Sequence, residues 1–479
     1  MRRVFFSNLL YIVVLNLLVK PLWVLGIDRE VQNTVGHGEY GLYFALFNLS
    51  FVFNILVDMG LTYHNGRTVA GNPMLLNTLY ARAVALKAML AVVYMAASLV
   101  AGFIWGIDAH AFVWLIVLCL SQVVQSFTLY FRSNLSGLHR YRLDSTVSIT
   151  DRVLMIALFG AVLLSPLRER FTIEWFVYGQ LFCYLCAMIL AWVLNKRLGA
   201  TFTGNVSWQS LQDLFRSSYP YALVVLFMSV YYRSDGIMLE RWVSNTEAGV
   251  YAAGYRLFDA MNQFGFLFSG LLIPMFARLL ATKEKVQELA ESGFGALFTF
   301  TTIAACASLA YRDEIMHLLY VDSNPYQANV FAAIMCALPG SAAVFIYGTL
   351  LSVSGHLRTL NMLTGAAAAF NVLVNLWAIP RFGALGAACT AAATHALIGV
   401  AEIIVCSRVF VFERFIALSL RLLVLTAGSL ALFYACRALE IHWITGLALG
   451  LSTSLALAGL AGTLQVQQLI RAVRLKAAR

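Results

Sequence analysis

Four charged side chains lie where the sequence is otherwise apolar enough to cross a membrane. Arg233 and Asp235 fall in one such stretch, and Arg256 and Asp259 fall in the next. An ionisable group inside a bilayer costs several kcal/mol unless it is paired or faces a water-filled cavity. The four groups are therefore candidates for contacts with a charged substrate or a coupling ion, or for an ion pair that only holds two helices together.

The sequence contains none of the motifs that would give such charges an enzymatic role. It lacks H-E-x-x-H, G-x-S-x-G and a phosphate-binding loop, and its eight histidines have no ligand spacing. Cys183 and Cys186 form a C-x-x-C, but they have no second ligand pair and an apolar setting. We expect no catalytic residue, no metal site and no cofactor.

Composition places the chain in a membrane. Of its 479 residues, 61% are hydrophobic and 12% are charged, whereas about a quarter are charged in soluble domains. Apolar runs predict fourteen spans of about 20 residues each, which makes the fold an all-α polytopic membrane protein. The spans are predicted at approximately 5–25, 41–63, 79–103, 107–131, 146–165, 172–194, 217–240, 249–275, 294–311, 328–350, 359–379, 385–407, 415–435 and 443–465.

The charges between the spans predict the orientation. Lys and Arg are concentrated in the loops on the side of the N-terminus, and cytoplasmic loops carry such an excess. Both termini are therefore expected in the cytoplasm. The net charge of +10 is explained by this bias and by attraction to anionic lipid headgroups, so we expect no nucleic-acid partner.

Two short patterns recur along the chain. The segment EYGLYFA at 39–45 returns as EAGVYAA at 247–253, and SGLHR at 136–140 returns as SGHLR at 354–358. The nearly constant offset predicts two pseudo-symmetric six-helix lobes of like orientation, related by an axis along the membrane normal. A C-terminal helix pair with a basic cytoplasmic tail completes the chain. The predicted boundaries are 1–200, 201–410 and 411–479.

In the predicted hairpin of spans 7 and 8, two of the four charges can pair with each other and two can contact substrate or ion. Asp235 lies about as far before the turn as Arg256 lies after it, so the two can form an ion pair across the antiparallel helices. Arg233 and Asp259 would then remain for substrate or ion. In the first lobe, Lys87 lies deep within a predicted span.

The order of these segments resembles a known family. GEYGLYFALFNLSFVFNILVDMGL, RSNLSGLHRYRL, YYRSDGIMLERWVSNTEAGVYAAGYRLFD and IPMFARLL are together similar to the bacterial polysaccharide transporters of the multidrug, oligosaccharidyl-lipid and polysaccharide exporter (MOP) superfamily, above all to the O-antigen repeat-unit flippases. The resemblance covers about residues 1–410. It implies a V-shaped pair of six-helix lobes around a cavity that opens alternately to each side.

The resemblance also implies an activity. Members move undecaprenyl-pyrophosphate-linked oligosaccharide from the inner to the outer leaflet of the bacterial cytoplasmic membrane, without covalent chemistry. The expected partners are this substrate, membrane lipids, H⁺ or Na⁺ as a coupling ion, and polysaccharide polymerase machinery. The implied substrate or ion contacts are Arg233, Asp235, Arg256 and Asp259, with Lys20, Arg82 and Lys87 as first-lobe counterparts. Lys20 and Arg82 lie near predicted helix ends, so their side chains can instead extend to the membrane surface.

Other functions remain open at this point. A lipid II flippase or a cation-coupled drug exporter would share the fold, although span 1 lacks a clustered acidic site of the kind expected in drug exporters. A membrane polymerase or ligase acting on lipid-linked sugars would be expected to have a large external loop, and the external connections here are short.

Overall fold

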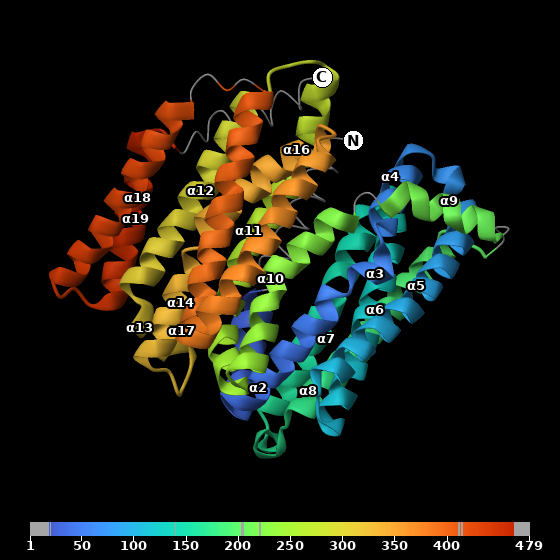
Figure 1. Ribbon diagram of the computed structural model, residues 1–479, viewed down its shortest axis with the longest axis horizontal. Coiled ribbons are helices and arrows are strands. Elements are labelled where there is room, and N and C mark those ends of the chain that lie inside the picture. Colours follow the sequence, from blue (N-terminus) through green and yellow to red (C-terminus); the bar gives the residue numbers. More distant parts are fainter. Residues whose placement is uncertain are drawn as a thin grey trace. The chain divides into compact units, whose positions relative to one another are not determined.

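The computed structural model describes residues 19, 21–138, 140–202, 206–219, 222–410, 412 and 415–463. Within this part of the chain every regular element is a helix (Figure 1), which confirms the all-α fold. A bilayer offers no water to satisfy backbone N–H and C=O groups, so a spanning chain must satisfy them internally, as a helix does. The chain divides into two compact units, Met1–Gly249 and Val250–Arg479.

Twelve helical stretches of the described residues are long and apolar enough to cross a membrane. One of them, α17 (Leu357–Val409), has 53 residues, or about 80 Å at 1.5 Å per residue, which exceeds the hydrocarbon thickness more than twofold. A break at Gly383, where φ is 56°, divides it into the predicted eleventh and twelfth spans. The first predicted span, 5–25, lies largely outside the described residues. The described spans agree with a fold of about fourteen transmembrane helices.

The first unit contains a bundle of long helices and several short ones. A π-helix, η1 (Leu22–Asp28), leads directly into the first long α-helix. The connection expected around 26–40 is therefore helical, apart from a break at Gly36, where φ is 84°. The α-helices are α2 (Arg29–Val52), α3 (Ile55–Asp58), α4 (Leu61–Gly71), α5 (Leu76–Trp105), α6 (Ala109–Gly137), α7 (Tyr141–Leu163), α8 (Ile173–Arg197), α9 (Trp208–Ser218) and α10 (Ala222–Trp242).

The stretch predicted as one second span is interrupted in the structure. After α2 ends, α3 forms only four residues, and Met59 (φ 42°) and Gly60 (φ 78°) adopt left-handed conformations before α4 begins. A left-handed non-glycine residue costs about 1–2 kcal/mol. The break changes the direction of the chain between α3 and α4. Helices α5 and α6 contact α3 beside this break.

The two copies of the repeated E-x-G motif contact each other within the first unit. A methyl group on Gly41 would lie 1.8 Å from the Asn245 carbonyl oxygen, and one on Gly249 would lie 2.0 Å from the His37 carbonyl oxygen. Gln32 donates a hydrogen bond to the Gly249 carbonyl at 2.8 Å. Glycine lets helix backbones approach this closely in a membrane, so α2 and the start of α11 (Asn245–Ala281) contact each other through main-chain atoms.

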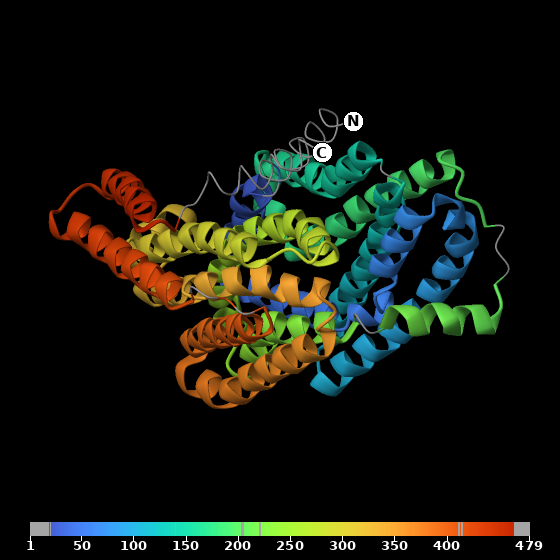
Figure 2. The ribbon, with the colours of Figure 1, turned by 90° about the horizontal axis from the view of Figure 1, so that it is seen from above.

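In the second unit, α12 packs against α14, α15, α18 and α19. The final pair, α18 and α19, pack on each other and along α12, as Figure 2 shows from above. Arg437 of α18 donates a hydrogen bond to the Ala310 carbonyl and lies 3.7 Å from Glu314. Besides α11 and α17, the elements are α12 (Gln287–Ala310), α13 (Arg312–Leu319), α14 (Pro325–Met335), α15 (Leu338–Ala343), η5 (Val344–Gly348), α16 (Thr349–Val353), α18 (Phe415–Ala438) and α19 (Trp443–Ala461).

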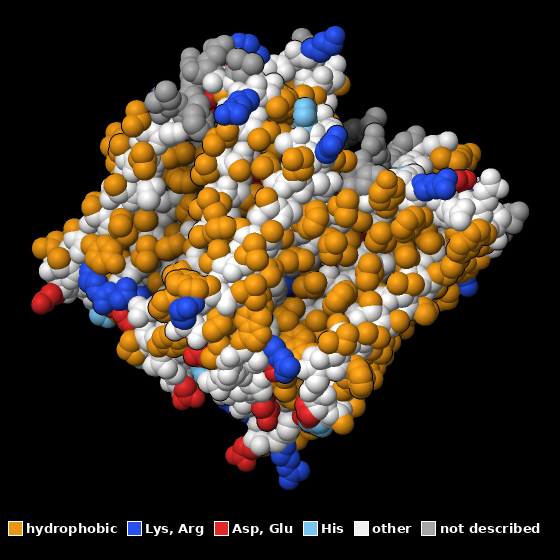
Figure 3. Space-filling view, viewed as in Figure 1, with side chains coloured by type: hydrophobic (Ala, Val, Ile, Leu, Met, Phe, Trp, Pro, Cys, Tyr) orange, Lys and Arg blue, Asp and Glu red, His pale blue; other side chains and the backbone are white. Residues whose placement is uncertain are grey.

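The surface is apolar along the helices, as contact with the hydrocarbon core of a bilayer requires. On the face shown in Figure 3, hydrophobic side chains cover most of the helix surfaces, and charged side chains lie mostly near helix ends. Large apolar side chains such as Phe103, Ile104 and Val92 are strongly exposed on α5. In water they would form an aggregation-prone patch, whereas lipid chains cover them in a membrane.

The close contact at Gly41 predicts a strong steric effect of one added methyl group. Gly41→Ala should lower the free energy of unfolding by about 1–3 kcal/mol or more, as expected for overpacking. The measurement is thermal unfolding of the purified protein in detergent. Gly38→Ala is the matched control on the same helix, because its new methyl would meet only the Thr246 hydroxyl at 4.0 Å. Equal melting temperatures for the two variants would contradict the packing described.

Candidate functional site

The most deeply placed charge of the first unit is Lys87 on α5, whose side chain is completely buried. Its Nζ lies 2.6 Å from Asp58 Oδ1 and donates to Ser126 Oγ at 2.7 Å. Asp58 also accepts hydrogen bonds from the backbone N–H of Thr62 at 3.3 Å and from the Thr62 hydroxyl. The ammonium is thus held at the broken helix by a carboxylate and a hydroxyl from two other helices.

The polar groups around the helix break continue on its other side. Asn54, in the turn between α2 and α3, donates to Gln122 Oε1 of α6 at 2.8 Å. Broken transmembrane helices are tolerated where they are buried in protein or line a cavity. An interrupted backbone, an ion pair and two amide side chains therefore lie together around the break between α2 and α4.

Arg233, on α10, lies beside the same helix break. Its guanidinium carbon is 4.7 Å from the centroid of the Phe51 ring, one helical turn before Asn54. A cation over an aromatic face is stabilised by the ring quadrupole, and more so when water is excluded. The sequence-predicted Arg233 and Lys87 thus lie near opposite ends of the segment that runs from Phe51 to Asp58.

Asp235 is buried on α10, with 1% of its surface exposed. The neighbouring Gly236 lies against Phe44 and Asn48 of α2, where a methyl group would come within 2.6 Å of the Phe44 ring. Close packing of α10 on α2 therefore encloses Asp235 in protein. Arg256 belongs to the second unit, so the ion pair expected between it and Asp235 stays a prediction.

A further cation within the spans of the first unit is Arg152 on α7, which is half-buried. Its guanidinium carbon lies 5.3 Å from the Trp23 ring centroid and 5.9 Å from that of Tyr184. On η1, Asp28 is 1% exposed and accepts a hydrogen bond from Tyr40 at 3.0 Å. The aromatic contacts of Arg152 were not predicted, and Asp28 and the start of α2 lie in the connection expected between the predicted spans 5–25 and 41–63.

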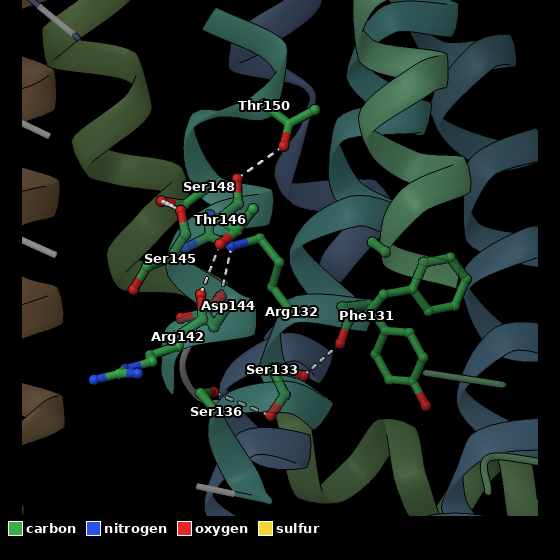
Figure 4. A network of polar contacts seen from close by, with 12 residues as sticks. Phe131, Arg132, Ser133, Ser136, Arg142, Asp144, Ser145, Thr146, Ser148 and Thr150 are labelled. Carbon is green, nitrogen blue, oxygen red and sulfur yellow. Dashed lines mark hydrogen bonds and ion pairs between the residues drawn. The ribbon is translucent and has the colours of Figure 1, made fainter. Parts of the chain in front are cut away.

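Other polar side chains of this unit hold helices together. Figure 4 shows Arg132 of α6 beside Asp144 of α7, with Nε donating to Oδ1 at 2.7 Å. In a separate chain of amides, Asn65 donates to Asn134 at 2.7 Å, and Asn134 donates to Asn195 at 2.9 Å. Hydrogen bonds between side chains of neighbouring helices stabilise membrane bundles by about 0.6 kcal/mol each. We assign these groups to packing.

The remaining first-lobe candidates are Lys20 and Arg82. Lys20 lies outside the described residues. Arg82 lines a polar pocket of about 360 Å³ next to α9, together with His64 and Asp213. This position near the start of α5 fits the alternative that Arg82 extends toward the membrane surface.

In the second unit, Arg256 and Asp259 lie on α11, and both are half-buried. Between them on the same helix, the Phe258 ring lies 5.7 Å from Tyr255, and Tyr255 stacks on Tyr251 at 5.6 Å. An aromatic stripe thus accompanies the two charges along α11.

The interior of the second unit carries buried polar residues on α17. Asn371 donates to Thr394 Oγ1 at 3.5 Å across the Gly383 break, and Asn375 donates to Asn371 at 3.3 Å. Glu402 is completely buried against Gly348 of the π-helix η5. Among the described residues, no cluster of three or more His, Cys, Asp or Glu side chains has the geometry of a metal site.

Comparison with known sequences decides the family. The family model for polysaccharide biosynthesis proteins matches residues 6–280, which is more than half of the chain. The chain belongs to the polysaccharide biosynthesis protein family. This membership confirms the resemblance seen in the sequence. Among proteins of curated function, none matches the chain by sequence.

Solved structures of MOP transporters share the fold of this family member. The lipid II flippase MurJ, in an inward closed conformation, aligns over 96% of this chain and 100% of its own with a TM-score of 0.71 and 10% identity. An inward-facing multidrug MATE transporter aligns over 83% and 94% with a TM-score of 0.62 and 13% identity. The Vibrio cholerae MATE transporter VcmN in its bent form aligns over 85% and 96% with a TM-score of 0.54 and 13% identity. At such identities the likeness shows the fold alone.

The structure of the Lys87 site predicts unequal effects of removing its two charges. Asp58→Asn leaves a fully buried ammonium without its counter-charge, whereas Lys87→Met leaves a carboxylate whose side chain is 21% exposed. Removing one partner of a buried pair costs about 3–5 kcal/mol. Asp58→Asn should therefore lower the melting temperature in detergent more than Lys87→Met does, and the double variant should recover part of the loss.

The control for this comparison is Asp144→Asn, which removes a carboxylate from an arginine that is 26% exposed. It should lower the melting temperature less than Asp58→Asn. The assignment fails if Asp58→Asn and Asp144→Asn destabilise equally, or if Lys87→Met is the more harmful single change at the buried site.

Proposed function

We propose that this protein is a flippase that moves undecaprenyl-pyrophosphate-linked oligosaccharide repeat units, such as those of O-antigen lipopolysaccharide, from the inner to the outer leaflet of the bacterial cytoplasmic membrane. The observation that carries the proposal is the set of cations inside the membrane spans of a polysaccharide biosynthesis protein. Lys87 is held at a broken helix, Arg233 lies beside the same break, and Arg256 is half-buried on α11.

The chemistry of the substrate matches these cations. A pyrophosphate bears negative charge and loses hydration when it enters a low-dielectric path, and arginine replaces that hydration through several N–H donors in fixed geometry. Lysine acts as a compact point charge for the same purpose. Asp235 and Asp259 are then available to balance the cations, or to bind H⁺ or Na⁺, when no substrate is bound.

Alternating access by the two predicted six-helix lobes, 1–200 and 201–410, is the mechanism that we propose. The interrupted second span supports it, because left-handed residues such as Met59 and Gly60 let one helix change direction. With both termini in the cytoplasm, export moves the anion outward across an inside-negative membrane. That step is downhill by about 2.3 kcal/mol per charge per 100 mV.

A lipid II flippase is the second candidate. Its support is the similarity to MurJ, which extends over 96% of this chain. Lipid II also joins a sugar to a lipid through pyrophosphate, so the same cations would serve. The two candidates differ in the sugar, and transport of each lipid by the purified protein separates them.

Loss of an intramembrane arginine should strongly reduce transport without unfolding the protein. Arg233→Gln and Arg256→Gln are each expected to reduce flipping in proteoliposomes by about tenfold or more, since a hydrogen bond to a charged group contributes about 1.5–3 kcal/mol. The matched controls are Arg241→Gln on α10 and Arg278→Gln on α11, both exposed near helix ends. Equal activity of the intramembrane variants and their controls would exclude a substrate contact.

Membrane potentials and gradients of H⁺ or Na⁺, imposed across proteoliposomes, test whether flipping is coupled to them. We expect flipping of the lipid-linked oligosaccharide to accelerate when the compartment on the donor leaflet's side is made electrically negative, because the substrate is an anion. An added dependence on ΔpH or on Na⁺ should disappear in an Asp259→Asn variant. If wild-type flipping ignores both ΔpH and Na⁺, the coupling-ion part of the proposal fails and the potential alone remains.

A further inference from the structure

An apolar groove in the first unit lies between α5 and the short helix α9. It encloses about 500 Å³, within the range of about 300–1,000 Å³ typical of ligand pockets. Its apolar lining includes Leu86, Leu90 and Val93 of α5 and Leu211 and Phe215 of α9. Figures 1 and 2 show α9 beside α5, and the two helices contact each other.

Helix α9 is amphipathic and has well-defined ends. Ser207 caps it, accepting a hydrogen bond from the Ser210 N–H while Ser210 Oγ accepts one from the Ser207 N–H, both at 3.2 Å. Trp208, Leu211 and Phe215 share one face at helical spacing and line the groove, whereas the opposite side borders the polar pocket beside Arg82. Such a helix lies in the interface of a membrane with its apolar face toward lipid chains.

The rim of the groove is built for an anionic headgroup. Arg216 lines it and is exposed, and none of the described residues forms an ion pair with this guanidinium. Trp208 and Tyr219, near the two ends of α9, are also exposed at the rim. Aromatic side chains that present an apolar body and a polar tip favour the headgroup level of a bilayer. Arg216 is complementary to a phosphate headgroup, and the apolar lining is complementary to the acyl chain of the same lipid.

We propose that this groove binds one anionic phospholipid, with an acyl chain between α5 and α9 and the headgroup phosphate at Arg216. An arginine close to an anionic leaflet contributes about 1 kcal/mol to the binding free energy, or about a fivefold change in affinity. The lipid would fill the space between α5 and α9. This inference goes beyond the transported substrate, since it concerns a resident membrane lipid on the outside of the first unit.

Brominated lipids can test the site on the full-length protein in nanodiscs. Bromine in the acyl chain quenches nearby tryptophan, and the contribution of Trp208 is the difference between wild type and Trp208→Phe. Brominated phosphatidylglycerol should quench Trp208 with an apparent affinity about fivefold higher than brominated phosphatidylcholine, the ratio that corresponds to about 1 kcal/mol. Equal quenching by the two lipids would overturn the headgroup assignment.

Matched variants separate the headgroup contact from the chain contact. Arg216→Gln should abolish the preference for phosphatidylglycerol, while Arg197→Gln, an exposed arginine at the end of α8 outside the groove, should keep it. Val93→Phe should reduce quenching by filling the groove, while Val100→Phe, two turns further along α5, should not. If the variants and their controls behave alike, general surface charge or bulk lipid explains the signal and the site does not exist.

A competition arm distinguishes phospholipid from the lipid-linked substrate. Addition of a polyprenyl phosphate at equal mole fraction should leave the quenching by brominated phosphatidylglycerol unchanged. Displacement of the brominated lipid would assign the groove to the substrate's own chain and overturn the phospholipid assignment. A transport defect in the Arg233→Gln variant is a separate outcome, so failure of one proposal does not imply failure of the other.

Discussion

The completely buried ammonium of Lys87 imposes a constraint that the surrounding structure satisfies. A charge within a membrane span must be neutralised by a counter-charge or by water, and here Asp58 and Ser126 come from two other helices to meet it. Asp58 can reach Lys87 because α2 and α4 do not form one continuous helix. The left-handed residues Met59 and Gly60 change the direction of the chain directly after Asp58. Backbone irregularity and buried charge therefore depend on each other.

A second constraint acts at the contact of the repeated glycines. Gly41 and Gly249 each lie against main-chain atoms of the other's helix, so α2 and the start of α11 are joined without intervening side chains. Contacts of this kind bring backbone dipoles close and leave no freedom for substitution. Helix α10 also lies along α2, and Arg233 thereby comes to lie over the Phe51 ring beside the interrupted segment.

The spans could be predicted from hydropathy because a bilayer demands about 20 apolar residues per crossing. Lys87 and Arg233 could be singled out for the same reason, since each is a charge within an apolar run. The partners of these two cations could not be predicted. Contacts such as that of Lys87 with Ser126 join residues far apart in the sequence, and they arise only when the helices pack. Asp28 was missed where a loop was expected, although the π-helix η1 buries it. Helix α9 was missed as well, although the spacing of Trp208, Leu211 and Phe215 after a Ser-capped start was a usable signal.

The central claim is that cations inside the spans carry an anionic lipid headgroup across the membrane. The most direct measurement compares two lipids with the same oligosaccharide in proteoliposomes of the purified protein, one linked through pyrophosphate and one through an uncharged glycosidic bond. The account predicts protein-dependent flipping of the pyrophosphate-linked lipid and little flipping of the neutral one. Equal flipping of both lipids, or no flipping of the charged lipid by folded protein, would contradict it.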